Sequence, residues 1–243
     1  MSIPKICDMH CHVLPGIDDG SKSWEMSMRM LKKSWDAGVR AVIATPHYLP
    51  WRHTIIAKDV PVLCQEATRR FKEEFGLDLP IYPGQELYYH IELVSAIEEG
   101  KALTLNGTRY VLVEFAEEEN YSVMVEAAES LLRNGYQPIF AHVERFSALR
   151  NEKNLDDILG RGVLLQSNFE EPSNGGFLNG TVRWLAKRYK REEISFLGSD
   201  MHNLTKRMPV TSEQLEWFDK HLDEEYFQEI AWKNAEKIFH PSN

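Results

Sequence analysis

The stretch RAVIATPH, residues 40–47, decides the fold class, because it is a short aliphatic run that ends in a polar side chain. A run of this length and composition is typical of a buried β-strand. A helical pattern precedes it over 24–35 and stops at Gly38, and another follows over roughly 58–75. The local order is therefore helix, strand, helix.

The same alternation recurs along the whole chain. Further short apolar runs occupy 5–10, 79–86, 109–115, 137–143, 162–168 and 194–200. Further helical patterns cover roughly 120–134, 152–160, 180–190 and 211–238. Seven strands that alternate with helices predict parallel βα units, and we expect an α/β fold. The chain has 243 residues and no internal repeat or linker, which predicts one domain over residues 1–243.

Charge and composition exclude some classes of partner. Lys and Arg number 28 against 37 Asp and Glu, and the net charge of −9 argues against nucleic acid or an anionic membrane surface as the main partner. The start of the chain lacks a secretion signal, and no apolar run is long enough to cross a membrane, which predicts a soluble, cytoplasmic protein. We expect the three cysteines, Cys7, Cys11 and Cys64, to remain thiols. The sequence leaves the oligomeric state open.

Acidic and imidazole side chains gather at the ends of the predicted strands. Parallel sheets and barrels carry their chemistry at this carboxyl edge. The side chains are His10, His12, Asp19, His47, Glu86, Glu114, His142, Asp200 and His202. Only the sixth run, which ends in Gln166, Ser167 and Asn168, offers no obvious ligand.

These side chains together point to metal ions. A single histidine at a strand end is more often part of the scaffold, but His10 and His12, like Asp200 and His202, are two residues apart and can point the same way. Five imidazoles and four carboxylates on one rim would repel or lose hydration without cations. Nine ligands suit about three divalent ions with positions left open for water and substrate. The positive charge of three divalent ions would exceed the negative charge of the four carboxylates, and this excess would attract an anion such as a phosphate.

Six motifs match a known family in order and spacing. They are DMHCHVLPGIDDG at 8–20, TPH at 45–47, GQE at 84–86, VEF at 113–115, HVERF at 142–146 and GSDMHN at 198–203. Over roughly residues 7–208 the chain thereby resembles the bacterial protein-tyrosine phosphatases of the polymerase-and-histidinol-phosphatase (PHP) superfamily, which are encoded with capsule and exopolysaccharide genes. The resemblance implies a distorted (β/α)7 barrel with a trinuclear centre, usually of manganese, although iron and zinc suit the same ligands.

The resemblance also implies a role for each residue. One metal would be held by His10, His12, Glu86 and Asp200, a second by Glu86, Glu114 and His142, and a third by Asp19, His47 and His202. Arg145 and Arg207 would bind the phosphate. Asp200, His202 or a water would protonate the leaving group, and the sequence does not distinguish among these three donors. The chain departs from the family in HVERF, where HPERY is common, and in the loop at 166–177.

Three functions follow as hypotheses. The first is a metal-dependent phosphatase that acts on phosphotyrosine in the tail of a membrane-linked bacterial tyrosine kinase. The second is a small-molecule phosphatase, for which histidinol phosphate is the superfamily precedent. The third is a catalytically silent metal-binding regulator that docks on the kinase.

Several other residues of interest lie outside the predicted ligand set. Cys64 and Arg70 fit the Cys-x5-Arg pattern of cysteine phosphatases. The stretch between them has no glycine and is predicted to be helical, so we reject catalysis by a cysteine nucleophile. Trp51 and Arg52 follow His47 closely and are predicted to line a substrate groove. We expect the remaining histidines to lie on the surface or in loops, namely His53, His90, His221 and His240.

Overall fold

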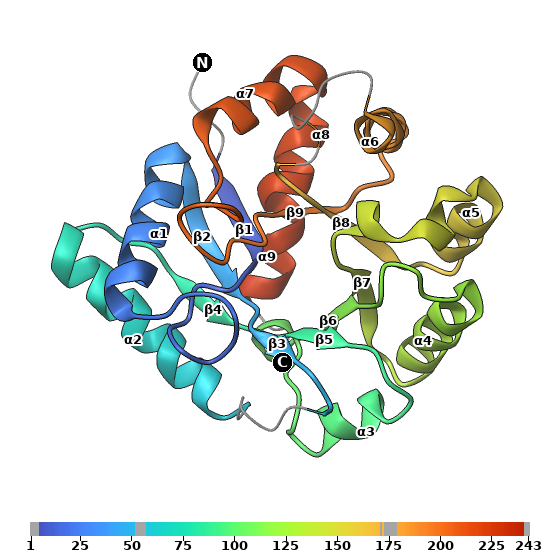
Figure 1. The fold of residues 1–243 in the computed structure, drawn as a ribbon, viewed down its shortest axis with the longest axis horizontal. Coiled ribbons are helices and arrows are strands. Elements are labelled where there is room, and N and C mark those ends of the chain that lie inside the picture. The colour runs from blue at the N-terminus through green and yellow to red at the C-terminus, as the bar shows by residue number, and fades with distance from the viewer. Residues whose placement is uncertain (1–4, 52–56, 171, 173–178, 241–243) are drawn as a thin grey trace.

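The computed structural model describes residues 5–51, 57–170, 172 and 179–240, and these form a curled parallel sheet wrapped by helices (Figure 1). The strands are β1 (Ile6–Cys11), β2 (Val39–Ala44), β3 (His47–Tyr48), β4 (Ile81–Pro83), β5 (Glu86–Tyr88), β6 (Tyr110–Glu114), β7 (Gln137–Phe140), β8 (Leu164–Asn168) and β9 (Phe196–Gly198). All seven predicted runs contain a strand, and the predicted α/β class is confirmed.

Two of the seven runs are each divided into two short strands. The order is β1-β2-β4 in one sheet and β3-β5-β6-β7-β8-β9 in the other, with every pairing between these described strands parallel. The pairing continues across the interruption, because Gly84 N donates to Ala44 O at 2.9 Å and Glu86 N donates to Pro46 O at 3.2 Å. The pairs β2–β3 and β4–β5 therefore each fill one position of a common sheet.

Backbone hydrogen bonds also join the last strand to the first. Asp200 N donates to His10 O at 2.7 Å, and His12 N donates to Met201 O at 3.0 Å. A parallel bridge links Cys11 to Met201. These contacts close the curled sheet at the edge that carries the polar strand ends.

The helices pack around this sheet. They are α1 (Trp24–Ala37), α2 (Asp59–Phe75), α3 (Leu93–Glu98), α4 (Tyr121–Arg133), α5 (Glu152–Gly160), α6 (Gly180–Lys190), α7 (Ser212–His221), α8 (Glu224–Gln228) and α9 (Asn234–Phe239). The short α3 was not predicted from the sequence. No helix in the described ranges is both long and apolar enough to cross a membrane.

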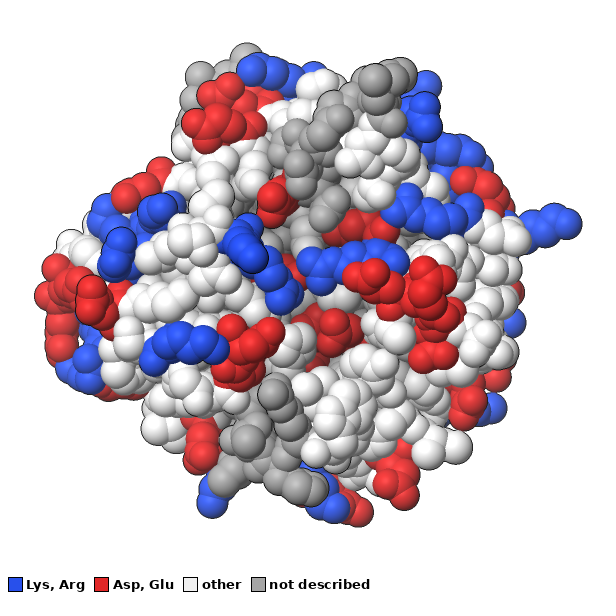
Figure 2. All heavy atoms as spheres, in the orientation of Figure 1, with Lys and Arg blue, Asp and Glu red and all other residues white. Residues whose placement is uncertain are grey.

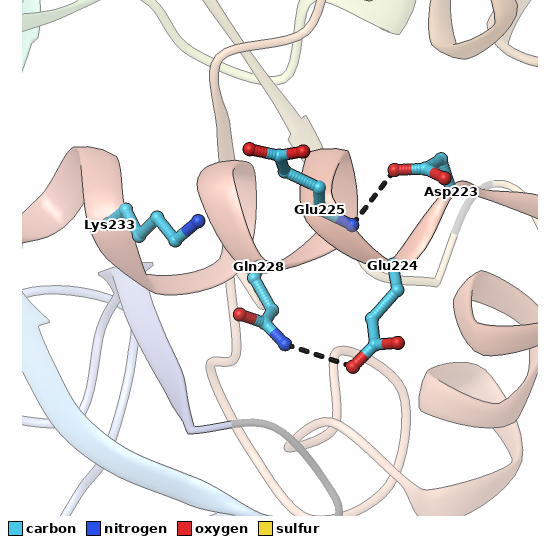
Figure 3. A pocket seen from close by; sticks show the side chains of 5 residues that line it. All are labelled: Asp223, Glu224, Glu225, Gln228 and Lys233. Carbon is cyan, nitrogen blue, oxygen red and sulfur yellow. Dashed lines mark hydrogen bonds between the residues drawn. The ribbon is translucent and has the colours of Figure 1, made fainter.

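The single helix predicted over 211–238 is wrong, because the chain breaks it at Leu222. Leu222 is extended, with φ −110° and ψ 156°, and ends α7. The carboxylate of Asp223 then accepts the backbone N–H of Glu225 at 2.9 Å and begins α8, as Figure 3 shows. A helix start capped by Asp satisfies an N–H that a continuous helix would otherwise bond internally. A π-helical turn over Glu229–Lys233 separates α8 from α9.

The apolar core has an inner and an outer part. The inner cluster includes Met9, Leu112 and Ile139 from the strands and Ile238 from α9. Asn106, just before β6, donates its side-chain amide to Ile238 O at 2.9 Å, which places α9 at the amino ends of the strands. The opposite, carboxyl end is thereby left free for the polar strand ends.

An irregularity in β1 sets which of its side chains face inward. Met9 belongs to the inner cluster, but Cys11, two residues later, belongs to the outer one. The pairing of β1 with β2 shifts register between Asp8 and Cys11. Bulges of this kind re-aim side chains next to functional sites. Here the shift allows His10 and His12 to point into the barrel above Met9.

Candidate metal centre

Glu86, at the start of β5, lies at the centre of the predicted ligand set. Its Oε1 is 3.2 Å from His10 Nε2 and 2.8 Å from His142 Nε2. Its Oε2 is 3.2 Å from His12 Nε2 and 2.9 Å from His47 Nδ1. Four imidazoles from three strand ends, those of β1, β2 and β7, therefore meet one fully buried carboxylate.

The other predicted ligands surround this centre. Glu114 Oε1 is 3.5 Å from His142 Nε2, and its Oε2 is 3.5 Å from His47 Nδ1. Asp19 Oδ1 is 3.4 Å from both His47 Nε2 and His202 Nε2. The remaining ligand, Asp200, places Oδ1 3.4 Å from His12 Nε2 and 3.5 Å from His202 Nδ1. The structure thus brings all nine side chains into one cluster.

The side chains form three overlapping groups, and within each group the ligand atoms lie within 4.8 Å of one another. They are His10, His12 and Glu86; His47, Glu86 and Glu114; and His12, Asp19, His47 and His202. All three groups overlap the sets that the resemblance implied, but the first lacks Asp200 and the third also contains His12. The second differs, because His47 stands in it where the resemblance placed His142. His47 faces two groups, Nδ1 toward Glu86 and Nε2 toward Asp19.

Several of these atoms are buried without a hydrogen bond, which is the feature that fits a cation. Among the described residues, Glu86 Oε2, His47 Nδ1 and His202 Nε2 have no hydrogen-bond partner. A buried polar atom left without a partner costs about 1–3 kcal/mol. Carboxylate oxygens and imidazole nitrogens that converge in this way are the donor set of divalent transition metals, so the residues present fit such ions.

The electrostatics of the cluster favour the binding of positive charge. Burial lowers the pKa of His47 and of His142, but the nearby carboxylates of Glu114 and Glu86 outweigh this effect and raise the two values to about 10 and about 9. Burial raises the pKa of Glu86, but the neighbouring His10, His12 and His142 together lower it by more, so this carboxylate stays ionised. Protons on the imidazoles therefore balance the carboxylates when no cation does.

Two side chains that the sequence analysis did not assign hold the ligands in place. Asp18 Oδ2 lies 2.7 Å from His12 Nδ1 and accepts the backbone N–H of His47 at 3.2 Å. Gln166 Oε1 lies 3.0 Å from His10 Nδ1 and accepts the backbone N–H of His142 at 2.8 Å. Partners of this kind orient a ligating histidine and fix which nitrogen faces the metal.

No pattern in the sequence separated these two residues from their neighbours. Asp18 lies next to Asp19 in the same turn, and only the geometry shows that Asp19 faces His47 and His202 while Asp18 holds His12 from behind. Gln166 belongs to β8, the strand that supplies no ligand. Its side chain contacts predicted ligands that come from β1 and from the end of β7.

Two ligands have backbone conformations that are unusual for residues other than glycine. His142 has φ 31° and Asp200 has φ 53°. Such left-handed positions persist where surrounding contacts hold them, and they cluster at functional sites. Next to Asp200, Ser199 donates its N–H and Oγ–H to Asp8 at 2.8 and 2.6 Å. This buried carboxylate anchors the turn that presents Asp200.

Both predicted arginines lie at the edge of the cluster. Arg145 Nη2 is 2.8 Å from Asp200 Oδ2, and Arg207 Nη2 is 2.5 Å from Asp200 Oδ1. Their guanidinium groups remain partly exposed. Figure 2 shows basic and acidic side chains side by side at the middle of one face of the molecule. An anion that approaches from solvent can therefore reach both guanidinium groups.

The cysteine and histidines that match no motif position lie apart from the cluster or outside the described residues. Cys64 is buried in α2, where burial raises its pKa, and Arg70 pairs with Glu66 on the same helix. This helical setting offers no phosphate-binding loop, in agreement with the rejection of cysteine chemistry. His90 is half-buried in a loop, and His221 and His240 are exposed. Arg52 and His53 fall outside the described residues.

Comparison with known proteins places the chain in a family. Residues 6–240 match the model of the family described as capsular polysaccharide synthesis, CpsB/CapC. The chain belongs to this family. It is 30% identical to the tyrosine-protein phosphatase CpsB of Streptococcus agalactiae over 240 residues, which cover 95% of this chain and 97% of that protein. It is also 30% identical to the tyrosine-protein phosphatase YwqE of Bacillus subtilis, covering 95% of this chain and 90% of YwqE.

Solved structures agree with the CpsB/CapC assignment. The fold matches the crystal structures of YwqE from Bacillus subtilis and CpsB from Streptococcus pneumoniae, described as metal-dependent tyrosine phosphatases. The TM-score is 0.86 at 25% identity, over 98% of this chain and 96% of the other. A phosphotriesterase homology protein from Escherichia coli shares the fold alone, with a TM-score of 0.61 at 9% identity. The resemblance drawn from the six motifs is thereby confirmed.

Proposed function

We propose that this chain is a metal-dependent phosphatase that hydrolyses phosphotyrosine in a protein and acts in capsule or exopolysaccharide synthesis. The observation that carries the proposal is the convergence of nine imidazole and carboxylate ligands, with two arginines at their edge. The activity given for CpsB and YwqE supports it. We further propose that residues 1–243 form one phosphatase domain in the cytoplasm.

The ligand set would hold about three divalent ions. We propose manganese, with iron and zinc as ions that the same donors accept. The holders would be His10, His12, Asp19, His47, Glu86, Glu114, His142, Asp200 and His202. When bound, such ions lower the pKa of water so that a nucleophile exists near neutral pH, and they stabilise charge on phosphate oxygens.

The chain's own residues would bind and orient the ester. A guanidinium fork matches two phosphate oxygens at once, so Arg145 and Arg207 would turn from Asp200 to the phosphate. Their release leaves Asp200 free to serve the metals. The phenol of tyrosine has a pKa of about 10 and leaves with less protonation than an alkoxide needs. Asp200, His202 or a water would supply that proton.

The proposed substrate is the phosphotyrosine tail of a bacterial tyrosine kinase. The capsule-synthesis family and the phosphatase activity of its members support this partner. The net charge of −9 gives no support to nucleic acid as a partner.

The test compares substrates on one metal-loaded preparation. Purified protein with manganese should hydrolyse a phosphotyrosine peptide, EDTA should abolish the activity, and Cys64→Ser should leave it within about twofold because that thiol is buried in a helix. A hundredfold preference for histidinol phosphate would replace the protein substrate with a small molecule. No turnover with manganese, iron or zinc would favour the silent regulator.

A further inference from the structure

Trp51 is a large aromatic side chain that the fold leaves exposed at the carboxyl edge. Its side chain is 62% exposed, and it lies four residues after His47. Its described ring contact is with Tyr88, edge-on, with ring centroids 4.9 Å apart and an interplanar angle of 77°. One face of the indole is therefore left without a partner in the described part of the chain.

Tyr88 ties this pair to the metal centre. On β5 it follows Glu86 by two residues, so the two side chains share a face of the strand, while Leu87 between them is fully buried on the other. Tyr88 is paired in register with Glu114, one of the nine ligands. The phenol thus stands one layer above Glu86, toward the open end of the barrel.

The arginines stand elsewhere on the same rim. Arg145 follows β7 and Arg207 follows β9, whereas Trp51 follows β3 and Tyr88 is the last residue of β5. In the closed order of strands, β6 lies between β5 and β7, and β1 lies between β9 and β3. If the metals and the arginines bind the phosphate of an ester, its organic group must point outward from the metal centre. Tyr88 and Trp51 lie on that outer side.

We propose that Trp51, held edge-on by Tyr88, forms the aromatic wall that receives the phenyl ring of the substrate, and so selects aryl over alkyl phosphate esters. The inference rests on the proposed phosphatase function and deepens it. The ring of a tyrosyl ester can stack on the free face of the indole, whereas the side chain of a phosphoserine is too short and has no π-face. Aromatic pairs gain affinity beyond the area they bury.

The experiment measures kcat/KM with manganese for one peptide carrying either phosphotyrosine or phosphoserine. Trp51→Ala should lower the value for phosphotyrosine on the order of tenfold and leave that for phosphoserine unchanged, while Trp51→Phe should retain most of the preference. Val62→Ala is the matched control, because Val62 is an apolar side chain 64% exposed on α2, and it should change neither value.

A binding measurement without turnover completes the test. Calorimetry of the manganese-loaded protein should show Trp51→Ala weakening benzylphosphonate but not methylphosphonate. Equal losses for both ligands, or no loss for either, would overturn the role of Trp51 while leaving the phosphatase proposal intact. Absence of hydrolysis of either peptide by the wild-type protein would instead remove the proposed function.

Discussion

Replacement of Asp18 by asparagine tests whether the contacts around the ligands control metal affinity. The carboxylate of Asp18 makes three hydrogen bonds, with His12 Nδ1 at 2.7 Å and with the backbone N–H groups of His47 at 3.2 Å and Gly20 at 2.9 Å. A carboxylate can accept from all three, but a side-chain amide has one acceptor oxygen and one donor nitrogen. In Asp18→Asn, the NH2 group must face at least one of these donors.

The magnitude follows from that mismatch. An unsatisfied buried donor costs about 1–3 kcal/mol, and outer partners of ligating histidines typically contribute ten- to a hundredfold in metal affinity. We therefore expect Asp18→Asn to weaken manganese binding by roughly ten- to a hundredfold, or about 1.4–2.7 kcal/mol. Because Asp18 holds His12 and does not face the substrate, kcat at saturating manganese should stay within about threefold.

The assay is the manganese dependence of phosphopeptide hydrolysis, with calorimetric titration of the same metal-free protein. Asp36→Asn is the control, because Asp36 is an exposed carboxylate paired with Lys32 on α1. An unchanged manganese affinity in Asp18→Asn would refute the reasoning. A collapse of kcat with unchanged affinity would also refute it, since Asp18 would then act in the chemistry itself.

Three further predictions concern the centre. Glu86→Gln removes the charge shared by four imidazoles and should lower the number of bound metals per chain and abolish turnover, as metal analysis and peptide hydrolysis would show. Arg145→Lys or Arg207→Lys keeps the charge but loses the fork, so kcat/KM should fall by roughly ten- to a hundredfold with metal content unchanged. With pKa values of about 10 and about 9, His47 and His142 hold protons at neutral pH and must lose them to bind metal. Burial also lowers the pKa of His12, but the neighbouring Asp18 raises it well above its usual range. Apparent metal affinity should therefore rise with pH up to about 10, and calorimetry in buffers of different ionisation enthalpy should show release of about three protons.

The strands and the ligand set could be predicted from the sequence because each depends on a local pattern. Short apolar runs that end in His, Asp or Glu give both the strand and the position of its last side chains, and parallel strands bring those ends to one edge. The positions of Glu86 and His202 follow from this rule although they are far apart in the chain.

Features that depend on contacts between distant segments could not be predicted. The division of His47 between two ligand groups depends on where Asp19 and Glu86 lie in space. The roles of Asp18 and Gln166 depend on which ring nitrogen faces them. The break before α8 depends on one capping carboxylate, Asp223, which the periodicity of 211–238 concealed.

The number of metal ions per chain tests the central claim most directly. Protein purified without added salts, then loaded with manganese and freed of excess, should be analysed by elemental mass spectrometry against its protein concentration. The nine converging ligands predict about three manganese ions per chain. Fewer than two ions per chain under these metal-replete conditions would contradict the account.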